Sequence, residues 1–322
     1  MNRQSDTDIT MGKTNLKVFS KTLQALAEKD KDVIALTSDS RGSGKLVPFS
    51  EKFPDQLVEI GIAEQNLVGV SAGLASCGKK VFAVSPACFL TTCALEQIKN
   101  DVAYADNPVK LIGISAGVSY GALGSTHHSL HDFAALRAVH NMTIVAPADN
   151  FESQKSIELA SEYNHPVYIR FGKKPMPLLH HQNMEFTFGK SIKLKDGNDL
   201  AIIATGECIY PAYEASLILE REKGIKMRVI SMHTIKPLDQ EMIFASAREC
   251  SGILTIEEHS VYGGLGEACA SMLLENGLYI PFKIMGIPDE YTITGSQTEI
   301  FNHYGISPDG ITQEALKLLK IK

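Results

Sequence analysis

Short apolar runs rich in β-branched residues alternate with longer segments of helical periodicity along most of the chain. In the first half, apolar residues return every three or four positions at 15–29, 64–77, 90–104 and 150–162, as on one face of a helix. The expected strands lie at 33–37, 57–60, 80–84, 109–114, 143–146 and 166–170. Strands that are joined by crossover helices form parallel sheets. We therefore predict an α/β domain whose mainly parallel sheet is flanked by helices.

A loop-like passage at 172–186 interrupts this alternation. It contains two prolines and two adjacent histidines and lacks a clear periodicity, a composition that suits an interdomain linker. Beyond it the alternation resumes, with expected strands at 199–206, 226–232 and 252–258 and expected helices at 210–223 and 239–249. A length of 322 residues suits two domains. We predict a first domain at 1–185, which includes the linker, and a second, smaller α/β domain at 186–322.

Charge and composition argue against several classes of protein. The net charge is −6 and no basic cluster is present, so we expect no nucleic-acid partner. The sequence has no uninterrupted apolar stretch of about 18 residues and no apolar signal core near its N-terminus, so we expect a cytoplasmic protein that neither enters nor crosses a membrane. The six cysteines contain no CxxC pair, and we expect from them neither a disulfide nor a zinc site.

One motif places a carboxylate at the start of a helix. In the segment 59–78, a strand end and a glycine precede Glu64, which lies in the first turn of the expected helix. Small residues recur along that helix at Gly69, Ala72, Gly73 and Ala75. A first-turn glutamate can simply interact with the helix dipole. The alternative is that the small residues let another helix approach closely and that Glu64 is buried in the resulting interface.

A second segment, 115–132, follows an expected strand and is too rich in glycine and serine to form a helix. Ligands of open parallel sheets bind at the carboxyl ends of the strands. The histidines His127, His128 and His131 could bind a metal, but only Asp132 is available to complete the set and adjacent histidines do not easily face one ion. We expect them instead to reach a polar substrate.

Together these segments resemble the thiamine diphosphate enzymes of the transketolase family. The family's GIxEx motif is matched by GIAEQN at 61–66. Its GxDGPTHQ loop is similar to GALGSTHHSLHD at 121–132, which precedes a similar strand, NMTIVAPAD, at 141–149. In the second half, VISMHTIKPLD at 229–239 and EEHSVYGGLGEA at 257–268 resemble the family's C-terminal domain. The resemblance implies a pyrimidine-binding domain followed by the transketolase C-terminal domain.

The other half of the family's cofactor site is missing. We find no GDG followed by an asparagine, the family's metal and diphosphate motif, because KDGND at 195–199 has neither the flanks nor the partner. The resemblance therefore implies the C-terminal half of a split, two-subunit transketolase that is inactive alone. An N-terminal subunit with the GDG and asparagine motif would bind Mg²⁺ or Ca²⁺ and share the thiamine diphosphate. This chain would contribute no metal ligand, and we expect an α2β2 heterotetramer.

The resemblance implies a cofactor role for three residues. Glu64 matches the glutamate that hydrogen-bonds the aminopyrimidine, so that its amine becomes an imine and takes the proton of the thiazolium carbon. In a dry interface, desolvation favours the protonated, donating acid. Phe89 matches the aromatic residue that stacks on the pyrimidine, and Asp39 matches an aspartate near the cofactor. Without the resemblance, Phe89 would be an ordinary core residue and Asp39 a turn residue.

Three further residues match groups that contact substrate. His127 corresponds to a histidine that hydrogen-bonds oxygens of the donor and acceptor sugars. Ser43 matches a serine at the substrate phosphate, although by itself it is typical of a turn. Arg170 matches an arginine that clamps the same phosphate, a task that suits a bidentate guanidinium; the alternative is an ion pair at a strand end.

The implied reaction moves a two-carbon ketol unit from a ketose phosphate to an aldose phosphate, as in the pentose phosphate pathway. Four positions depart from the family pattern, so the donor could be an unusual ketose: Ser115, Leu123, Thr92 and Leu95. Two alternatives remain, the β subunit of a 2-oxoacid dehydrogenase and a non-catalytic partner subunit. The STHH sequence argues against the first, and the presence of Glu64, Phe89 and His127 argues against the second. Deoxyxylulose phosphate synthase has a similar C-terminal half, but it is one long chain.

Overall fold

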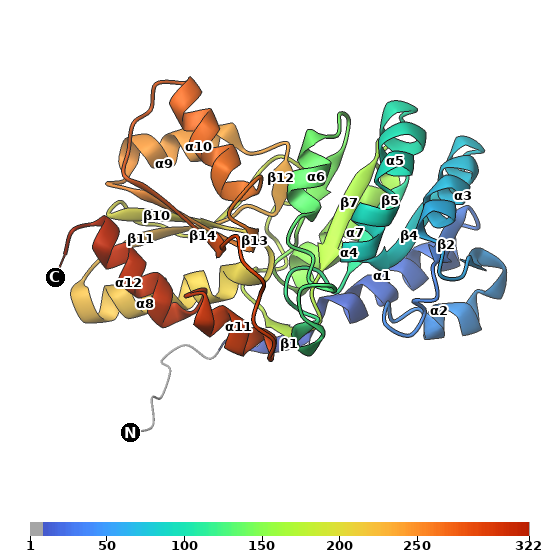
Figure 1. Cartoon of the computed structure of the whole chain (residues 1–322), viewed down its shortest axis with the longest axis horizontal. Helices are drawn as coiled ribbons and strands as arrows, with labels where there is room; N and C mark the ends of the chain where they lie inside the picture. The colour runs from blue at the N-terminus through green and yellow to red at the C-terminus, as the bar shows by residue number, and fades with distance from the viewer. Residues whose placement is uncertain (1–8, 322) are drawn as a thin grey trace.

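Seven strands, six of them from the first half of the chain, form one sheet in the computed structural model, which describes residues 9–321 (Figure 1). The strands are β2 (Val33–Thr37), β3 (Leu57–Glu59), β4 (Lys80–Pro86), β5 (Lys110–Ile114), β6 (Thr143–Val145), β7 (Val167–Phe171) and β12 (Thr234–Lys236). Their order is β12-β6-β7-β5-β4-β2-β3, and every neighbouring pair is parallel except β12 with β6. The N-terminal residues 1–8, where we expect no signal sequence, lie outside the described residues.

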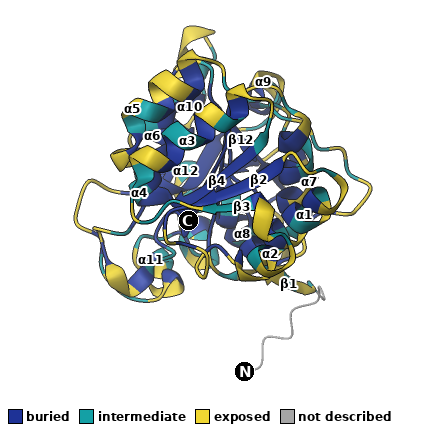
Figure 2. Cartoon of the chain, turned by 90° about the vertical axis from the view of Figure 1, so that its right-hand side faces the viewer, coloured by how far each residue is buried: buried dark blue, intermediate teal, exposed yellow. Residues whose placement is uncertain are grey.

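Helices cover both faces of this sheet because successive strand residues point to opposite sides. The helices are α1 (Asn15–Lys29), α2 (Val47–Lys52), η1 (Pro54–Gln56), α3 (Glu64–Ser76), α4 (Ala87–Cys93), α5 (Leu95–Gln97), η2 (Ile98–Tyr104), η3 (Gly121–Leu123), α6 (Asp132–Ala138) and α7 (Asn150–Glu162). Along β4, Val81 and Ala83 pack with α3, α4 and α6, whereas Phe82 and Val84 pack with α1, α2 and α7. Figure 2 shows buried strands at the centre and helices whose outer faces are exposed.

The single helix expected at 90–104 is wrong. The chain instead forms α4, the short α5 and the π-helix η2. Two threonine hydroxyls donate back to carbonyls one turn earlier, Thr91 to Ala87 at 2.7 Å and Thr92 to Cys88 at 2.5 Å. Back-bonding of this kind bends helices, and α4 ends directly after these threonines.

The second half forms a five-stranded sheet of order β14-β13-β10-β11-β9, parallel except at β9. Its strands are β9 (Ile192–Lys195), β10 (Leu200–Ala204), β11 (Met227–Ser231), β13 (Ile253–Ser260) and β14 (Phe282–Ile287). Its helices are η4 (Gly206–Cys208), α8 (Ile209–Lys223), α9 (Gln240–Glu249), α10 (Leu265–Glu275), α11 (Gln297–His303) and α12 (Pro308–Leu318). Helices α9 and α10 lie on one face and α8 and α12 on the other (Figure 1). The two parallel-rich, helix-flanked sheets confirm the predicted fold class.

The two halves share one apolar core. A single cluster of buried side chains extends from Leu67 and Leu136 in the first half to Ile203 and Leu265 in the second. Strand β12, from the second half of the chain, also joins the first sheet. The passage that we expect to be a linker contains a strand, β8 (Pro175–Pro177), which pairs with β1 (Met11–Thr14) near the N-terminus. The boundary at residue 185 stays a prediction. None of the described helices has the length and apolar character that crossing a membrane requires.

Candidate active site

The predicted cofactor residues follow the carboxyl ends of neighbouring strands. Asp39 lies just after β2, Glu64 follows β3, Phe89 follows β4, and His127 lies in the loop that follows β5. Because these strands are parallel, their carboxyl ends share one edge of the sheet. The topology therefore brings together residues that are up to 88 positions apart in the sequence, from Asp39 to His127.

Glu64 is the first residue of α3 and is half-buried. Its Oε1 lies 3.4 Å from the hydroxyl of Ser38 and 3.4 Å from that of Ser85, and the two hydroxyls are 2.7 Å apart. Among the described residues, Glu64 has no ion-pair partner, and its side chain caps no backbone N–H of α3. Its remaining hydrogen-bonding capacity is thus available to a ligand at the sheet edge.

The ring of His127 lies between two aromatic side chains. Its centroid is 5.4 Å from that of Phe89 and 5.4 Å from that of Tyr120, and both contacts are edge-to-face. The Nδ1 of His127 is 3.0 Å from the hydroxyl of Thr126. Burial raises the pKa of Tyr120, which keeps its phenol neutral. This arrangement brings Phe89 and His127 together, and the sequence offered no signal for Tyr120 as their neighbour.

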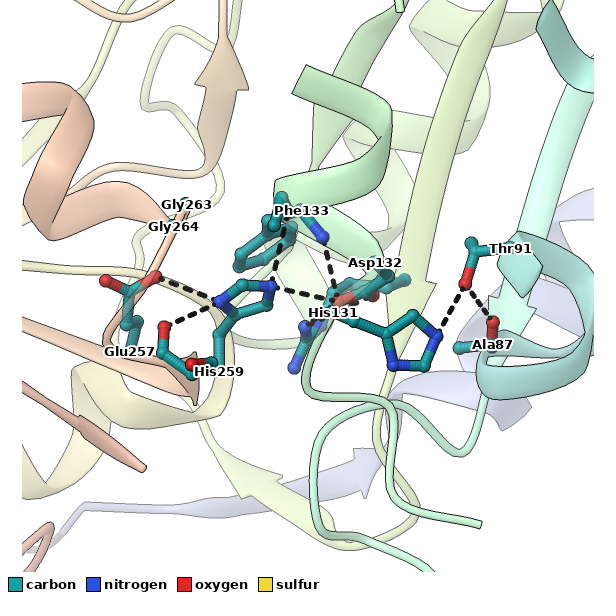
Figure 3. Close-up of polar contacts among 12 residues, drawn as sticks. Ala87, Thr91, His131, Asp132, Phe133, Glu257, His259, Gly263 and Gly264 are labelled. Carbon is teal, nitrogen blue, oxygen red and sulfur yellow. Dashed lines mark hydrogen bonds and ion pairs between the residues drawn. The ribbon is translucent and has the colours of Figure 1, made fainter. Parts of the chain in front are cut away.

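The other two loop histidines point to different partners. The Nε2 of His131 lies 3.4 Å from the Thr91 hydroxyl (Figure 3). His128 is buried, with Nδ1 at 2.6 Å from the hydroxyl of Thr292. Within residues 9–321, no group of three or more His, Cys, Asp or Glu side chains is arranged to hold a metal ion. The three histidines therefore do not converge.

Asp39 and Ser43 lie in an exposed loop that Glu59 organises. The Glu59 carboxylate accepts from the backbone N–H of Asp39 at 2.7 Å and of Gly61 at 3.1 Å. Asp39 has a positive φ of 49°, and its side chain is exposed beside the sheet edge. The hydroxyl of Ser43 turns back to the carbonyl of Ser40 at 3.1 Å. Asp39 is therefore open to a ligand, whereas the Ser43 hydroxyl is used inside its own loop.

Arg170 occupies a buried cluster, which is at odds with the phosphate contact that the resemblance implies. Its Nη1 donates to Asp132 at 2.9 Å, its Nη2 donates to the Glu258 carbonyl at 2.8 Å, and only 6% of the residue is exposed. Asp132 also accepts from the Tyr168 hydroxyl at 2.7 Å. In Figure 3, Asp132 lies at the centre of the polar contacts between the two halves. The guanidinium is thus committed to internal partners.

Lys173, three residues later, is a free cation at the site. Its Nζ lies 4.7 Å from the ring centroid of Tyr120, on the residue that flanks His127. The side chain is exposed and, among the described residues, has no ion-pair partner. The position of Lys173 just past the end of β7 was a signal for ligand binding, since residues at the carboxyl end of a parallel strand lie at the edge where ligands bind. The sequence predicts this role for Arg170, which matches a family arginine, and the structure adds Lys173 as a second candidate.

The departures from the family pattern lie at or near this edge. Leu123 is 54% exposed, next to the turn that carries His127. Ser115 is buried with a positive φ of 55°. Thr92 uses its hydroxyl within α4, and Leu95 packs against the shared core. Of these residues, Leu123 and Thr92 are exposed, whereas Ser115 is buried.

Comparison with known families and structures gives a consistent result. The model of a family described as "Transketolase, pyrimidine binding domain" matches residues 12–177, and that of "Transketolase, C-terminal domain" matches residues 189–311. The chain is 50% identical over 94% of its length to a subunit of the apulose-4-phosphate transketolase of Phocaeicola vulgatus, of which it covers 97%. It is 33% identical over 92% of its length to the SqwH subunit of the 6-deoxy-6-sulfo-D-fructose transketolase of a Clostridium species, of which it covers 91%.

A similar solved structure is that of a split-gene transketolase in the form of an inactive β4 tetramer. It is 34% identical in sequence and superposes with a TM-score of 0.86, over 97% of this chain and 99% of that one. The match spans nearly the whole of that chain, so both domains occur there in the same order and arrangement.

Proposed function

Because the chain belongs to the transketolase family, we propose that it is one subunit of a split, thiamine diphosphate-dependent transketolase. The enzyme transfers a two-carbon ketol unit from a ketose phosphate to an aldose phosphate. The single observation that carries this proposal is Glu64, a half-buried carboxylate at the sheet edge whose hydrogen-bond partners in the described part of the chain are two serine hydroxyls. A 2-oxoacid dehydrogenase β subunit gains no support, since the two relatives described above, which match this chain over nearly their whole length, are named transketolase subunits.

The residues present fit the pyrimidine end of the cofactor. When bound, thiamine diphosphate supplies a nucleophilic thiazolium carbon. Glu64 would hold the proton that it shares with the aminopyrimidine, and the Ser38 and Ser85 hydroxyls orient its carboxyl group. Phe89 would pack on the ring, and Asp39 would lie beside it.

We assign substrate binding to His127 and Lys173. His127 is held between Phe89 and Tyr120 with its Nδ1 beside the Thr126 hydroxyl, and its Nε2 can hydrogen-bond a sugar oxygen. Lys173 takes the phosphate-binding task that the sequence assigns to Arg170, because its ammonium group is exposed and Arg170 is committed to Asp132. A contact from Ser43 would require its hydroxyl to leave the Ser40 carbonyl.

The relatives support an anionic ketose as donor. One is named for apulose 4-phosphate and another for 6-deoxy-6-sulfo-D-fructose, so both names carry an anionic substituent. Lys173 suits either group. A pentose phosphate donor and a cytoplasmic location both stay predictions from the sequence.

The partner subunit would complete the site. We propose that an N-terminal chain with the GDG and asparagine motif binds Mg²⁺ or Ca²⁺ and the diphosphate, and that two copies of each chain form an α2β2 heterotetramer. The similar split-gene transketolase is described as inactive in its β4 form, and this supports a need for the partner chain.

Isothermal titration calorimetry tests the proposal. We expect the chain alone to show no heat of binding with thiamine diphosphate and Mg²⁺, and the mixture with its partner to bind the cofactor and to transfer a two-carbon unit. Tight binding and turnover by the isolated chain would contradict the split-enzyme assignment. Turnover of a 2-oxoacid in place of a ketose would favour the dehydrogenase alternative.

A further inference from the structure

A loop of the C-terminal domain holds the turn that carries His127. Thr292 lies between β14 and α11, 165 positions after His127 in the sequence. Its backbone N–H donates to the Ser125 hydroxyl at 3.1 Å, and its own hydroxyl lies 3.0 Å from that of Ser125 and 2.6 Å from Nδ1 of His128. Thr292 is 7% exposed. Two residues that flank His127 are therefore bound by one buried threonine.

The hydrogen-bonded group formed by Ser125, His128 and Thr292 has one consistent assignment of donors and acceptors. Nε2 of His128 lies 3.0 Å from the carbonyl of Gly121 and must donate to it, so Nδ1 of the neutral ring is an acceptor. The hydroxyl of Thr292 then donates to Nδ1 and accepts from Ser125. Burial lowers the pKa of His128, which favours the neutral ring that this chain of bonds requires. Each hydrogen bond of the group thus has one defined donor and one defined acceptor.

Backbone packing brings the same two loops into close contact. A Cβ on Gly121, whose φ is +57°, would lie 2.5 Å from the carbonyl oxygen of Gly295. At the other end of the turn, the carbonyl of Gly124 accepts the N–H groups of both His127 and His128. A shift of the His128 ring or of Ser125 would therefore be transmitted to the backbone of His127.

We propose that Thr292 is a positioning residue for His127. Through Thr292, the C-terminal domain fixes the position of the substrate-binding turn. The inference rests on the substrate-binding role proposed for His127. Thr292 contacts neither cofactor nor sugar in this proposal. It holds the 121–128 turn so that the His127 ring stays between Phe89 and Tyr120.

Steady-state kinetics of the assembled enzyme test the inference. Thr292→Val keeps the side-chain volume and removes the hydroxyl, so we expect kcat/KM for a ketose phosphate donor to fall about 10- to 100-fold, the range that misplacement of a binding group produces. The loss should lie mainly in KM. Thr292→Ser retains the hydroxyl and should restore kcat/KM to within about threefold of wild type. Thr294→Val, an exposed change in the same loop, should leave both constants unchanged.

Histidine-selective NMR of the full chain gives a readout that does not depend on activity. We expect Thr292→Val to change the Nδ1 resonance of His128 and to shift the ring resonances of His127, which lie beside two aromatic rings. Ser125→Ala removes the hydroxyl that bonds to Thr292 from the opposite loop, and it provides a second test if Thr292→Val folds poorly. Unchanged His127 resonances and unchanged KM in Thr292→Val or Ser125→Ala would overturn the inference.

His127→Ala separates this inference from the proposed function. If His127→Ala raises KM and Thr292→Val does not, the positioning role is wrong while the function stands. If His127→Ala leaves KM unchanged, the substrate-binding role of His127 is wrong, and with it the functional premise of the inference.

Discussion

Two neighbouring glutamates at the sheet edge have different tasks. Glu59 accepts from two backbone N–H groups and lies 3.6 Å from Arg41, so it holds the loop that carries Asp39. Among residues 9–321, Glu64 accepts only from hydroxyls, at 3.4 Å, and it is half-buried. The first carboxylate is committed to the fold, whereas the second keeps hydrogen-bonding capacity for a ligand.

We expect Glu64→Gln to lower turnover of the assembled enzyme about 10²- to 10⁴-fold, the usual contribution of an acid–base group. The substitution preserves size but removes the titratable proton. Deuterium exchange at the thiazolium carbon of the bound cofactor, compared with wild type, measures the effect directly. Glu51→Gln, an exposed change in α2, is the matched control. Exchange as fast in Glu64→Gln as in wild type would remove Glu64 from the mechanism.

Lys173 and Arg170 should respond differently to truncation. Lys173→Ala removes an exposed cation. We expect KM to rise about tenfold for a phosphorylated ketose, the loss of roughly one charge-assisted contact, and to change little for an uncharged ketose.

Arg170→Ala leaves the buried Asp132 without its cation, so we expect the free energy of unfolding to fall by about 3–5 kcal/mol. Urea denaturation and donor-dependent kinetics check both. A donor-selective rise in KM for Arg170→Ala without loss of stability would restore its predicted role.

At the scale of elements, a buried ion cluster ties the linker passage to helix α7. His180 lies 3.0 Å from Glu152 and 3.1 Å from Asp149, the N-cap of α7. The other side of the cluster reaches β11, where the Ser231 hydroxyl donates to Glu152 at 2.6 Å. The linker passage, α7 and the second sheet are thus joined at one point.

The ion pair between His180 and Glu152 predicts a pH dependence of stability. Burial opposes the charged imidazolium, but Glu152 and Asp149 outweigh it and raise the pKa of His180 to about 10. Burial likewise favours the neutral acid, but His180 lowers the pKa of Glu152 to about 2. A raised histidine pKa contributes stability below its unfolded value of 6.5 that is lost as the pH rises towards 10. A lowered glutamate pKa contributes above 4.5 and is lost as the pH falls towards 2.

We therefore expect His180→Gln to lower the free energy of unfolding by about 3–5 kcal/mol between about pH 4.5 and 6.5, because it leaves buried carboxylates without a cation. The difference from wild type should shrink above pH 6.5. Urea unfolding across the pH range measures it, and His181→Gln, the exposed neighbour, should match wild type. A difference that stays constant up to pH 10 would argue against the ion pair.

At the scale of the whole molecule, helix α3 presents an open strip beside the site. Apart from its chain neighbours and the backbone of its own helix, a Cβ placed on Gly69 or Gly73 would meet no atom of residues 9–321 within 4 Å. On the opposite side of the helix, Ala72 and Ala75 pack into the core. The small residues that the sequence grouped together thus divide into a core face and an open face, and only the open face can join a second chain.

We expect Gly73→Leu to block assembly without destabilising the chain. Replacing an exposed helical glycine by leucine adds about 0.5–1 kcal/mol of helix propensity, whereas the added side chain would prevent close approach of another helix. Mass measurement of the mixed subunits should show loss of the α2β2 species, and thermal unfolding of the variant should not fall. Lys21→Leu, an exposed change in α1, is the control. Wild-type assembly by Gly73→Leu would place the interface elsewhere.

The sequence alone determined the parallel-rich α/β fold, because apolar periodicity is a local property. Through short motifs it also predicted Glu64, Phe89 and His127 as site residues, and these roles stay predictions. It did not reveal the broken helix after Thr92. Nor did it reveal strand β12, whose three residues carry too little pattern and whose pairing with β6 is non-local.

Only the tertiary structure decided which charged groups are free to bind a ligand. In the sequence, Arg170 and Lys173 are both cations near the end of one strand. Folding brings Asp132 and Glu258 against Arg170, from 38 and 88 positions away, and leaves Lys173 exposed beside Tyr120. The contact between Thr292 and the His127 turn arises in the same way. Burial and charge pairing depend on distant segments that meet in space, so no local pattern could have distinguished these residues.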